Sequence, residues 1–253
     1  MTRSPFSKTN ESKIHGIHHN VDVYLTYCGG VDYVRELIER VRDASGITHN
    51  PVDVKLSPDE CFELIRNFYQ TDMAAELQKA AESVMWTELL VAVRRSMHHL
   101  HKAEYEYRTT VYHLNGGSVV PVDRYAAIGI GADIAHAVFG PIYQGHVGVL
   151  ESSFNMIDAL RRVKATVPGC GGNSTVMTIA NAGDYPVDLI PSAELKQIED
   201  DCEFLDDKLR MLYQWVPSSL TEEGFEHNFE VLKKKIIERR SQPNRLNFAW
   251  KPS

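Results

Sequence analysis

The residues best suited to bind a metal ion are histidines, and they are gathered in two clusters. The clusters comprise His15, His18 and His19, and His98, His99 and His101. Imidazole nitrogens bind transition metals, and spacings of two residues on a strand or three on a helix bring such side chains to one face. A metal site needs further ligands, and neither cluster has a nearby cysteine or more than scattered acids. We therefore interpret both clusters as surface or strand-end histidines and expect no metal centre.

The pair Gly129-x-Gly131, which follows a predicted strand and opens a predicted helix, is the second feature that could do chemistry. Glycines at such a turn let the backbone approach a pyrophosphate at a helix N-terminus. The dinucleotide fingerprint, however, has a third glycine where this chain has Ile134, and it follows the first strand of a βαβ unit rather than a hairpin. We expect no nucleotide cofactor. A small-molecule enzyme that uses this turn is a third hypothesis, and stabilisation by nucleotides would reveal it.

Composition and charge exclude several classes of protein. The 253 residues include 27 Lys and Arg against 34 Asp and Glu, a net charge of −7, which disfavours nucleic acid or an anionic membrane as a partner. No apolar run reaches the roughly 18 residues of a transmembrane helix. We expect no secretory signal near Met1. The four cysteines lack short spacings, so they predict neither a disulfide scaffold nor a zinc knuckle, and we expect a reduced, cytoplasmic protein.

The strands are predicted from alternating apolar residues. Residues 1–12 are polar and are expected to form a loop. Between residues 13 and 26, apolar side chains recur at steps of two and four, which indicates two short strands on either side of residues 18–20. Further strands are expected over 86–93, 107–114, 119–128 and 174–180, with a hairpin turn at Asn115-Gly116-Gly117.

The helices are predicted from apolar residues at helical spacing and from capping residues. The first covers 31–44, where apolar residues recur at i, i+3, i+4 and i+7. Ser57 and Pro58 mark the start of the second, which continues or restarts over 74–83. Four more are expected over 129–143, 146–165, 192–215 and 222–240. A basic stretch in the last helix is interpreted as a solvated helix end.

Several short motifs occur in an order and spacing that resemble one known family. They include Lys13-Ile14-His15, Gly29-Gly30-Val31-Asp32, Asn115-Gly116-Gly117-Ser118, the run from Tyr125 to Gly131, and Cys170-Gly171-Gly172. Together, over about residues 12–181, they resemble the proteasome and HslV branch of the N-terminal-nucleophile hydrolases. The resemblance implies an α+β protein with an αββα sandwich, in which two antiparallel sheets lie between helix layers. It divides the chain into the loop 1–12, a proteasome-like core 13–181 and a helical C-terminal extension 182–253.

The resemblance also indicates which catalytic positions this chain retains. The family uses a chain-terminal threonine, whose hydroxyl attacks a peptide carbonyl while its own amino group takes the proton. The resemblance assigns Lys13 to the lysine that lowers the pKa of that hydroxyl, although we favour a vestigial or structural role for Lys13. Ile130 stands where the family has a serine, and residues 166–168 include no acid where the family has an aspartate. Thr2 is ten residues of mostly polar loop away from Lys13 and is not expected to replace the nucleophile.

These departures lead to two hypotheses. The first is a catalytically inactive, proteasome-like subunit with a structural or interaction role in an oligomer. The second is a threonine-type peptidase of the same class whose true N-terminus lies upstream of Met1, because loss of the family's first hairpin would leave an unpaired sheet edge. The family assembles into rings, so we expect a ring-like or stacked homo-oligomer. A partner chain or the C-terminal helices are expected to cover the open edge, and no cofactor is expected.

Overall fold

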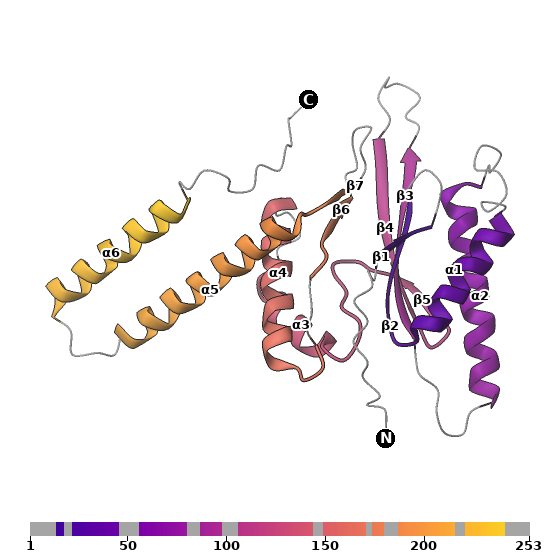
Figure 1. The fold of residues 1–253 in the computed structure, drawn as a ribbon, viewed down its shortest axis with the longest axis horizontal. Coiled ribbons are helices and arrows are strands. Elements are labelled where there is room, and N and C mark those ends of the chain that lie inside the picture. The colour runs from indigo at the N-terminus through magenta and orange to yellow at the C-terminus, as the bar shows by residue number, and fades with distance from the viewer. Residues whose placement is uncertain are drawn as a thin grey trace. The chain divides into compact units, whose positions relative to one another are not determined.

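The computed structural model describes residues 14–17, 22–45, 56–79, 87–97, 106–143, 149–170, 174–179, 187–215 and 221–240. Contacts divide the chain into two compact units, Met1–Leu189 and Ile190–Ser253. The described residues form an α+β protein, with six helices and a main sheet of five antiparallel strands (Figure 1). The predicted class, α+β, is confirmed at this level.

The main sheet of the first unit follows the order of the chain. Its strands are β1 (Ile14–Gly16), β2 (Val23–Cys28), β3 (Glu88–Met97), β4 (Glu106–Asn115) and β5 (Ser118–Pro121), which lie in that order. Every neighbouring pair is antiparallel. Leu25 of β2 pairs with Val91 of β3, and both are buried on the same face of the sheet. Alternate residues of the central strands therefore build an apolar face.

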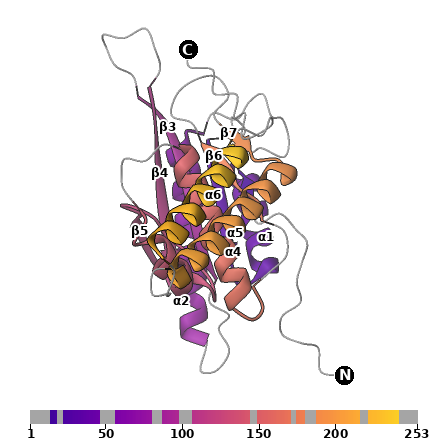
Figure 2. The same cartoon turned by 90° about the vertical axis from the view of Figure 1, so that its left-hand side faces the viewer.

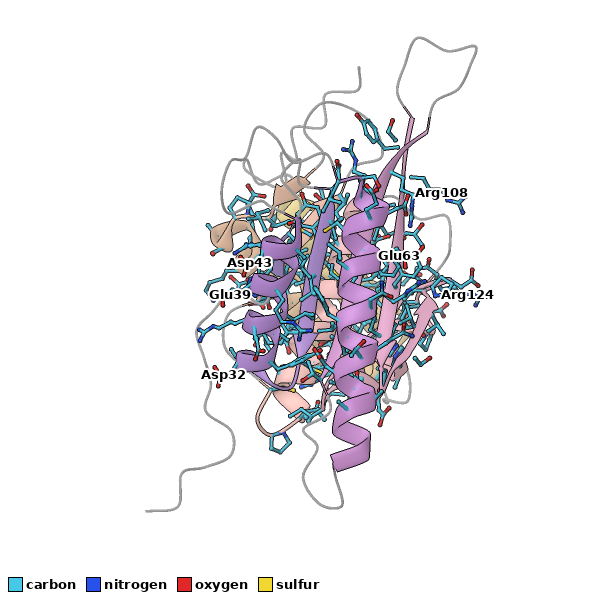
Figure 3. All side chains as sticks on the ribbon, turned by 90° about the vertical axis from the view of Figure 1, so that its right-hand side faces the viewer. Asp32, Glu39, Asp43, Glu63, Arg108 and Arg124 are labelled. Atoms are coloured by element: carbon cyan, nitrogen blue, oxygen red, sulfur yellow. The ribbon has the colours of Figure 1, made fainter. Side chains whose placement is uncertain are left out.

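Two helices, inserted between β2 and β3, cover this apolar face. They are α1 (Val31–Ser45) and α2 (Pro58–Lys79), and both lie on one side of the sheet (Figure 1). The buried residues of α1 recur at helical spacing and include Val34, Leu37, Ile38 and Val41. Figure 3 shows Asp32, Glu39 and Asp43 of α1 on its outer side. The helix thus has one apolar and one charged face, as the sequence pattern predicts.

Thr87, immediately before β3, connects both helices to the sheet. The amide of Gly30, just before α1, donates to Thr87 Oγ1 at 3.0 Å. The hydroxyl of Tyr69 in α2 donates to the carbonyl oxygen of Thr87 at 2.7 Å. The polar groups of this buried position are therefore used to fix the helix layer.

The hairpin between β4 and β5 has the two-residue turn that its glycines predict. Asn115 pairs with Ser118 across the turn. Gly116 has φ 55° and Gly117 has φ 84°, the left-handed region that this turn requires at both central positions. The hairpin prediction is confirmed, although the returning strand ends at Pro121 rather than near residue 128.

The rest of the first unit contains two helices and a small sheet. The helices are α3 (Ala132–Phe139) and α4 (Val149–Thr166). Strands β6 (Met177–Ile179) and β7 (Val187–Leu189) pair antiparallel, with Thr178 opposite Asp188. Strand β7 lies within the segment 182–253, which was predicted to be a helical extension. The division between the units follows Leu189, whereas the predicted core ends at 181.

The second unit consists of two helices in its described part. They are α5 (Ser192–Trp215) and α6 (Glu222–Arg240), whose bounds match the predicted ones. Figures 1 and 2 both show them side by side and running in opposite directions. The unit is thus a helical hairpin.

Candidate functional site

The predicted motif residues Gly129, Ile130 and Gly131 form a turn directly before α3, and packing explains both glycines. Gly129 has φ 90°, and a Cβ there would lie 3.2 Å from Cys28 Cβ, at the end of β2. A Cβ on Gly131 would overlap Val163 Cγ1 of α4 and lie 3.3 Å from Cys170 Sγ. The turn therefore packs against Cys28 at Gly129 and against Val163 and Cys170 at Gly131. Both glycines are needed for close packing.

The residue between these glycines carries no group for acid–base chemistry. The side chain of Ile130 is 63% exposed. Its Cδ1 lies 3.5 Å from where a Cβ on Gly169 would stand, and Gly169 has φ 88° in the turn after α4. Two tight turns thus meet beside an exposed apolar side chain. A hydroxyl at this place could donate or accept a proton, and an isoleucine side chain cannot.

Several residues that the sequence analysis singles out lie outside the described residues. They are Thr2, Lys13, Gly171 and Gly172, and five of the six clustered histidines, His18, His19, His98, His99 and His101. The sixth, His15 of β1, stacks on Tyr27 with ring centroids 5.8 Å apart. Among the residues that the structure describes, no group of three or more His, Cys, Asp or Glu could hold a metal ion.

A lysine and a serine close the turn that follows α4. Lys164 Nζ donates to Ser174 Oγ at 2.5 Å, which joins the last turn of α4 to the segment before β6. Lysine beside serine is one arrangement that can activate a hydroxyl nucleophile. In the sequence this pair gives no signal, because ten residues and a turn separate the two positions. Ser174 is therefore a second hydroxyl to control for in any test of activity.

A buried ion pair lies on the face of the main sheet opposite α1 and α2. Arg94 of β3 is 4% exposed, and its Nη1 lies 3.3 Å from Asp22 Oδ1, just before β2. Its guanidinium also lies 3.5 Å above the ring centroid of Tyr107 in β4. Burying a charge is costly unless it is paired, and here the pair and the ring both compensate it. No motif in the sequence predicts this cluster.

Tyr24, on the same face of the sheet, has a buried hydroxyl without a hydrogen-bond partner. Burial raises its pKa to about 12, and the neighbouring Asp22 carboxylate adds to this effect. The phenol therefore stays neutral at physiological pH and is a poor general base. The largely buried polar side chains on this face of the sheet, Asp22, Tyr24 and Arg94, are therefore best explained by a structural role.

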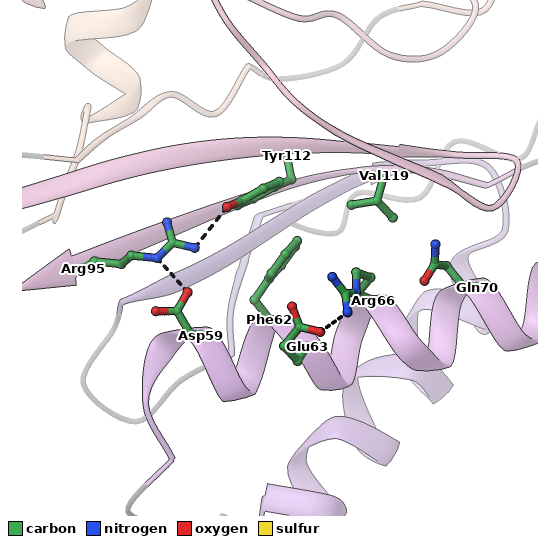
Figure 4. A pocket seen from close by; sticks show the side chains of 8 residues that line it. All are labelled: Asp59, Phe62, Glu63, Arg66, Gln70, Arg95, Tyr112 and Val119. Carbon is green, nitrogen blue, oxygen red and sulfur yellow. Dashed lines mark hydrogen bonds and ion pairs between the residues drawn. The ribbon is translucent and has the colours of Figure 1, made fainter.

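A hollow of about 370 Å³ lies between α2 and the main sheet (Figure 4). Arg95 of β3 donates to Asp59 Oδ1 at 2.6 Å and to the Tyr112 hydroxyl at 3.0 Å. Burial alone would lower the pKa of Arg95, but these hydrogen bonds raise it, so the group remains a cation. Arg66 pairs with Glu63 on the helix side. The two cations of the hollow are thus matched by two anions.

The side chains that line the hollow are better explained by the attachment of α2 to the sheet than by ligand binding. Phe62 of α2 stacks on Tyr112 of β4 with ring centroids 4.2 Å apart, which closes its floor. Gln70 donates to the carbonyl oxygen of Gly117 in the β4–β5 turn at 3.0 Å. Arg66 Nε is its buried polar atom without a hydrogen-bond partner. These contacts fasten α2 to the sheet.

Comparison with known proteins identifies no relative of this chain. No protein-family model and no curated protein matches the sequence. No helix in the described part of the chain is both long and apolar enough to cross a bilayer.

Proposed function

We propose that this chain is a structural, catalytically inactive subunit of a homo-oligomeric assembly, built on a proteasome-like αββα sandwich. The observation that carries the proposal is the turn at residues 129–131. Packing against Cys28, Val163 and Cys170 requires its glycines, while the position between them presents an exposed isoleucine. Such a turn retains the glycines that close packing requires, and it lacks a side chain that could donate or accept a proton.

The arrangement of the first unit supports the sandwich. Helices α1 and α2 bury one face of the main sheet. The opposite face includes the buried residues Tyr24 and Arg94, so part of it is covered too. The small sheet of β6 and β7, with α3 and α4 preceding it in the chain, supplies the elements that a second sheet and a second helix layer need.

The edges of the main sheet support an assembly. Among the described strands, β1 forms one edge with only three residues and β5 forms the other with four. An edge strand presents unpaired backbone groups and is normally covered or kept short. Pro121 ends β5 and protects that side. A neighbouring chain that docks along β1 would pair the backbone groups of this edge.

A turnover assay tests the catalytic half of this proposal. The purified full-length chain is incubated with fluorogenic peptides, with and without a covalent threonine-directed proteasome inhibitor, beside an active proteasome as a positive control. We expect no inhibitor-sensitive turnover. Hydrolysis that the inhibitor abolishes would overturn the proposal, and loss of hydrolysis in Ser174→Ala alone would point instead to the Lys164–Ser174 pair.

A further inference from the structure

The turn between β4 and β5 contains the one Asn-Gly step of the chain, at Asn115 and Gly116. An asparagine in such a step converts readily to an acid, because glycine has no side chain to keep its backbone nitrogen away from the asparagine side chain. Asn115 is exposed, and a Cβ on Gly117 would meet nothing within 4 Å. The turn is therefore open to the water that the conversion consumes.

The reaction needs only these two residues and water. The backbone nitrogen of Gly116 attacks Cγ of Asn115, a C–N bond forms, and the side-chain nitrogen leaves as ammonia with the proton of the Gly116 amide. Water then opens the resulting cyclic imide at either of its two carbonyl carbons. One product is aspartate, and the other is isoaspartate, in which the main chain passes through the former side chain and is one carbon longer.

Helix α2 holds the attacking nitrogen in place. The hydroxyl of Tyr69, which donates to the Thr87 carbonyl oxygen at 2.7 Å, accepts a hydrogen bond from the Gly116 amide. Tyr69 is fully buried, so water does not compete for this bond. The amide must give up its proton and rotate in order to attack Asn115, and the bond to Tyr69 opposes both changes. Pairing of Asn115 with Ser118 fixes the backbone on the other side of the attacked residue.

The surroundings of Asn115 make either product destabilising. Asn115 Nδ2 donates to Glu88 Oε1, on the neighbouring strand β3, at 3.4 Å. Aspartate in this position would set two carboxylates beside each other, and like charges on neighbouring strands are destabilising. Isoaspartate would lengthen the main chain at the pair of Asn115 and Ser118, which closes the turn. A two-residue turn fixes the register of its strands, so the longer chain would disturb the pairing of β4 with β5.

We propose that Asn115 is a site of spontaneous deamidation and that Tyr69 suppresses the reaction while α2 is docked on the turn. Local opening of α2, or unfolding, releases the Gly116 amide and permits the conversion. The product weakens the hairpin against which α2 packs, so a converted chain opens more readily than an unconverted one. The inference does not depend on the proposed assembly, because every contact that it uses lies within one chain.

Peptide mapping by mass spectrometry follows the reaction directly. The full-length chain is incubated at mildly alkaline pH, folded or in urea, and the conversion of amide to acid is measured at each asparagine. In urea Asn115 should convert faster than Asn67, which precedes the bulky Phe68. In the folded chain the conversion should be slowed by at least about 2- to 10-fold, the range that one hydrogen bond of ordinary strength provides. Equal rates in the folded and unfolded chain, or no conversion of Asn115 in urea, would overturn the proposal.

The variant Tyr69→Phe tests whether the hydroxyl provides the protection. It removes the acceptor of the Gly116 amide and keeps the ring, so conversion of Asn115 in the folded chain should be about 2- to 10-fold faster. The rate in urea should not change, because the contact is absent from the unfolded chain. A folded-state rate equal to that of the unaltered chain would rule out Tyr69 as the protecting group.

Two control variants separate this bond from a general loosening of the structure. Gln70→Ala removes the other contact of α2 with the turn, in which Gln70 donates to the Gly117 carbonyl oxygen at 3.0 Å, and leaves the bond to Tyr69 in place. Gly131→Ala strains a distant turn against Val163 and so lowers stability elsewhere. Both should convert at the rate of the unaltered chain. Acceleration in either control as large as in Tyr69→Phe would overturn the assigned protection.

The variant Asn115→Asp measures what the conversion does to the fold. Its urea midpoint should be lower than that of the unaltered chain, because the new carboxylate lies beside Glu88. In a Glu88→Gln background the same substitution should lower the midpoint less, since only one carboxylate remains. A midpoint that Asn115→Asp leaves unchanged would overturn the inference that the modification weakens this hairpin.

Discussion

At the scale of single residues, Gly131 is the position where packing leaves the least room. A methyl group there would overlap Val163 Cγ1, while its φ of −98° is one that alanine adopts readily. Gly131→Ala should therefore lower the free energy of unfolding by about 1–3 kcal/mol through overpacking. Urea denaturation measures this cost. In a Val163→Ala background the cost should shrink to less than about 1 kcal/mol, because the overlapping atoms are gone.

Two buried tyrosines allow the contribution of a buried hydroxyl's hydrogen bond to stability to be separated from that of its burial. Tyr24 has a buried hydroxyl without a partner, whereas the Tyr69 hydroxyl donates to the Thr87 carbonyl oxygen. Tyr69→Phe should destabilise the protein by about 1–3 kcal/mol, because it leaves a buried acceptor unmatched. Tyr24→Phe should be neutral or stabilising in the same denaturation experiment. A larger loss in Tyr24→Phe than in Tyr69→Phe would contradict this interpretation.

The same tyrosines should make stability depend on alkaline pH. Burial raises the pKa of Tyr24 to about 12 and that of Tyr69 to about 12, above the ordinary value of 10.0. The native state therefore holds these protons more tightly than the unfolded chain does, so the stabilisation is complete below pH 10 and is lost as the pH rises toward 12. Urea midpoints measured from neutral to alkaline pH should fall across this window, and less steeply in Tyr24→Phe. Midpoints that stay constant would refute the assignment.

Sequence predicted the residues of the glycine turns and missed those of the buried polar cluster. Gly116, Gly117 and Gly129 occupy turns that need a positive φ, and glycine itself is the signal for such turns. Arg94 gives no comparable signal, because its partner Asp22 lies 72 residues away. Only the pairing of β2 with β3 brings the two side chains together.

At the scale of elements, the start of α2 depends on a reciprocal capping box. Ser57 Oγ accepts from the Glu60 amide at 3.3 Å, and the Ser57 amide donates to Glu60 Oε2 at 2.7 Å. Ser57→Ala should lower the free energy of unfolding by about 1 kcal/mol, the usual effect of losing such a cap. Thermal and urea denaturation should both report this loss.

The capping box also predicts an acid-sensitive contribution from Glu60. The hydrogen bonds from the Ser57 amide and hydroxyl hold the pKa of Glu60 below its ordinary value. Its stabilising effect is present above that ordinary value and is lost as the pH falls through the lowered one. Glu60→Gln, which keeps an acceptor oxygen, should reduce the acid sensitivity while leaving most of the neutral-pH stability. An acid transition identical in both proteins would contradict the role of Glu60.

The accuracy of the element predictions followed the strength of the local signals. Helices α5 and α6 have the predicted bounds, and α1 ends one residue later than predicted, since helical spacing and caps are encoded nearby in sequence. Strand β3 continues past its predicted end at residue 93 to Met97. The added residues are mostly polar and give no strand signal, but they pair with β4, and Arg94 among them is buried beside Asp22. Strand β7 was missed because three residues carry too little alternation to be recognised, and it is stabilised by pairing with β6.

At the scale of the whole molecule, the described residues combine a buried apolar core with apolar side chains that are exposed at the surface. The core between α1, α2 and the main sheet is continuous, and its lining residues are nearly all buried. The exposed apolar side chains gather instead on the helical hairpin of the second unit. Sequence predicted both helices of that unit, whereas the exposure of their large apolar side chains became visible only in the structure.

Sedimentation equilibrium of the full-length chain is the measurement that tests the central proposal of self-assembly most directly. The subunit mass is 28.6 kDa. At tens of micromolar we expect a mass of at least twice this value, with dissociation on dilution. A single species of 28.6 kDa across that concentration range would contradict the proposed assembly.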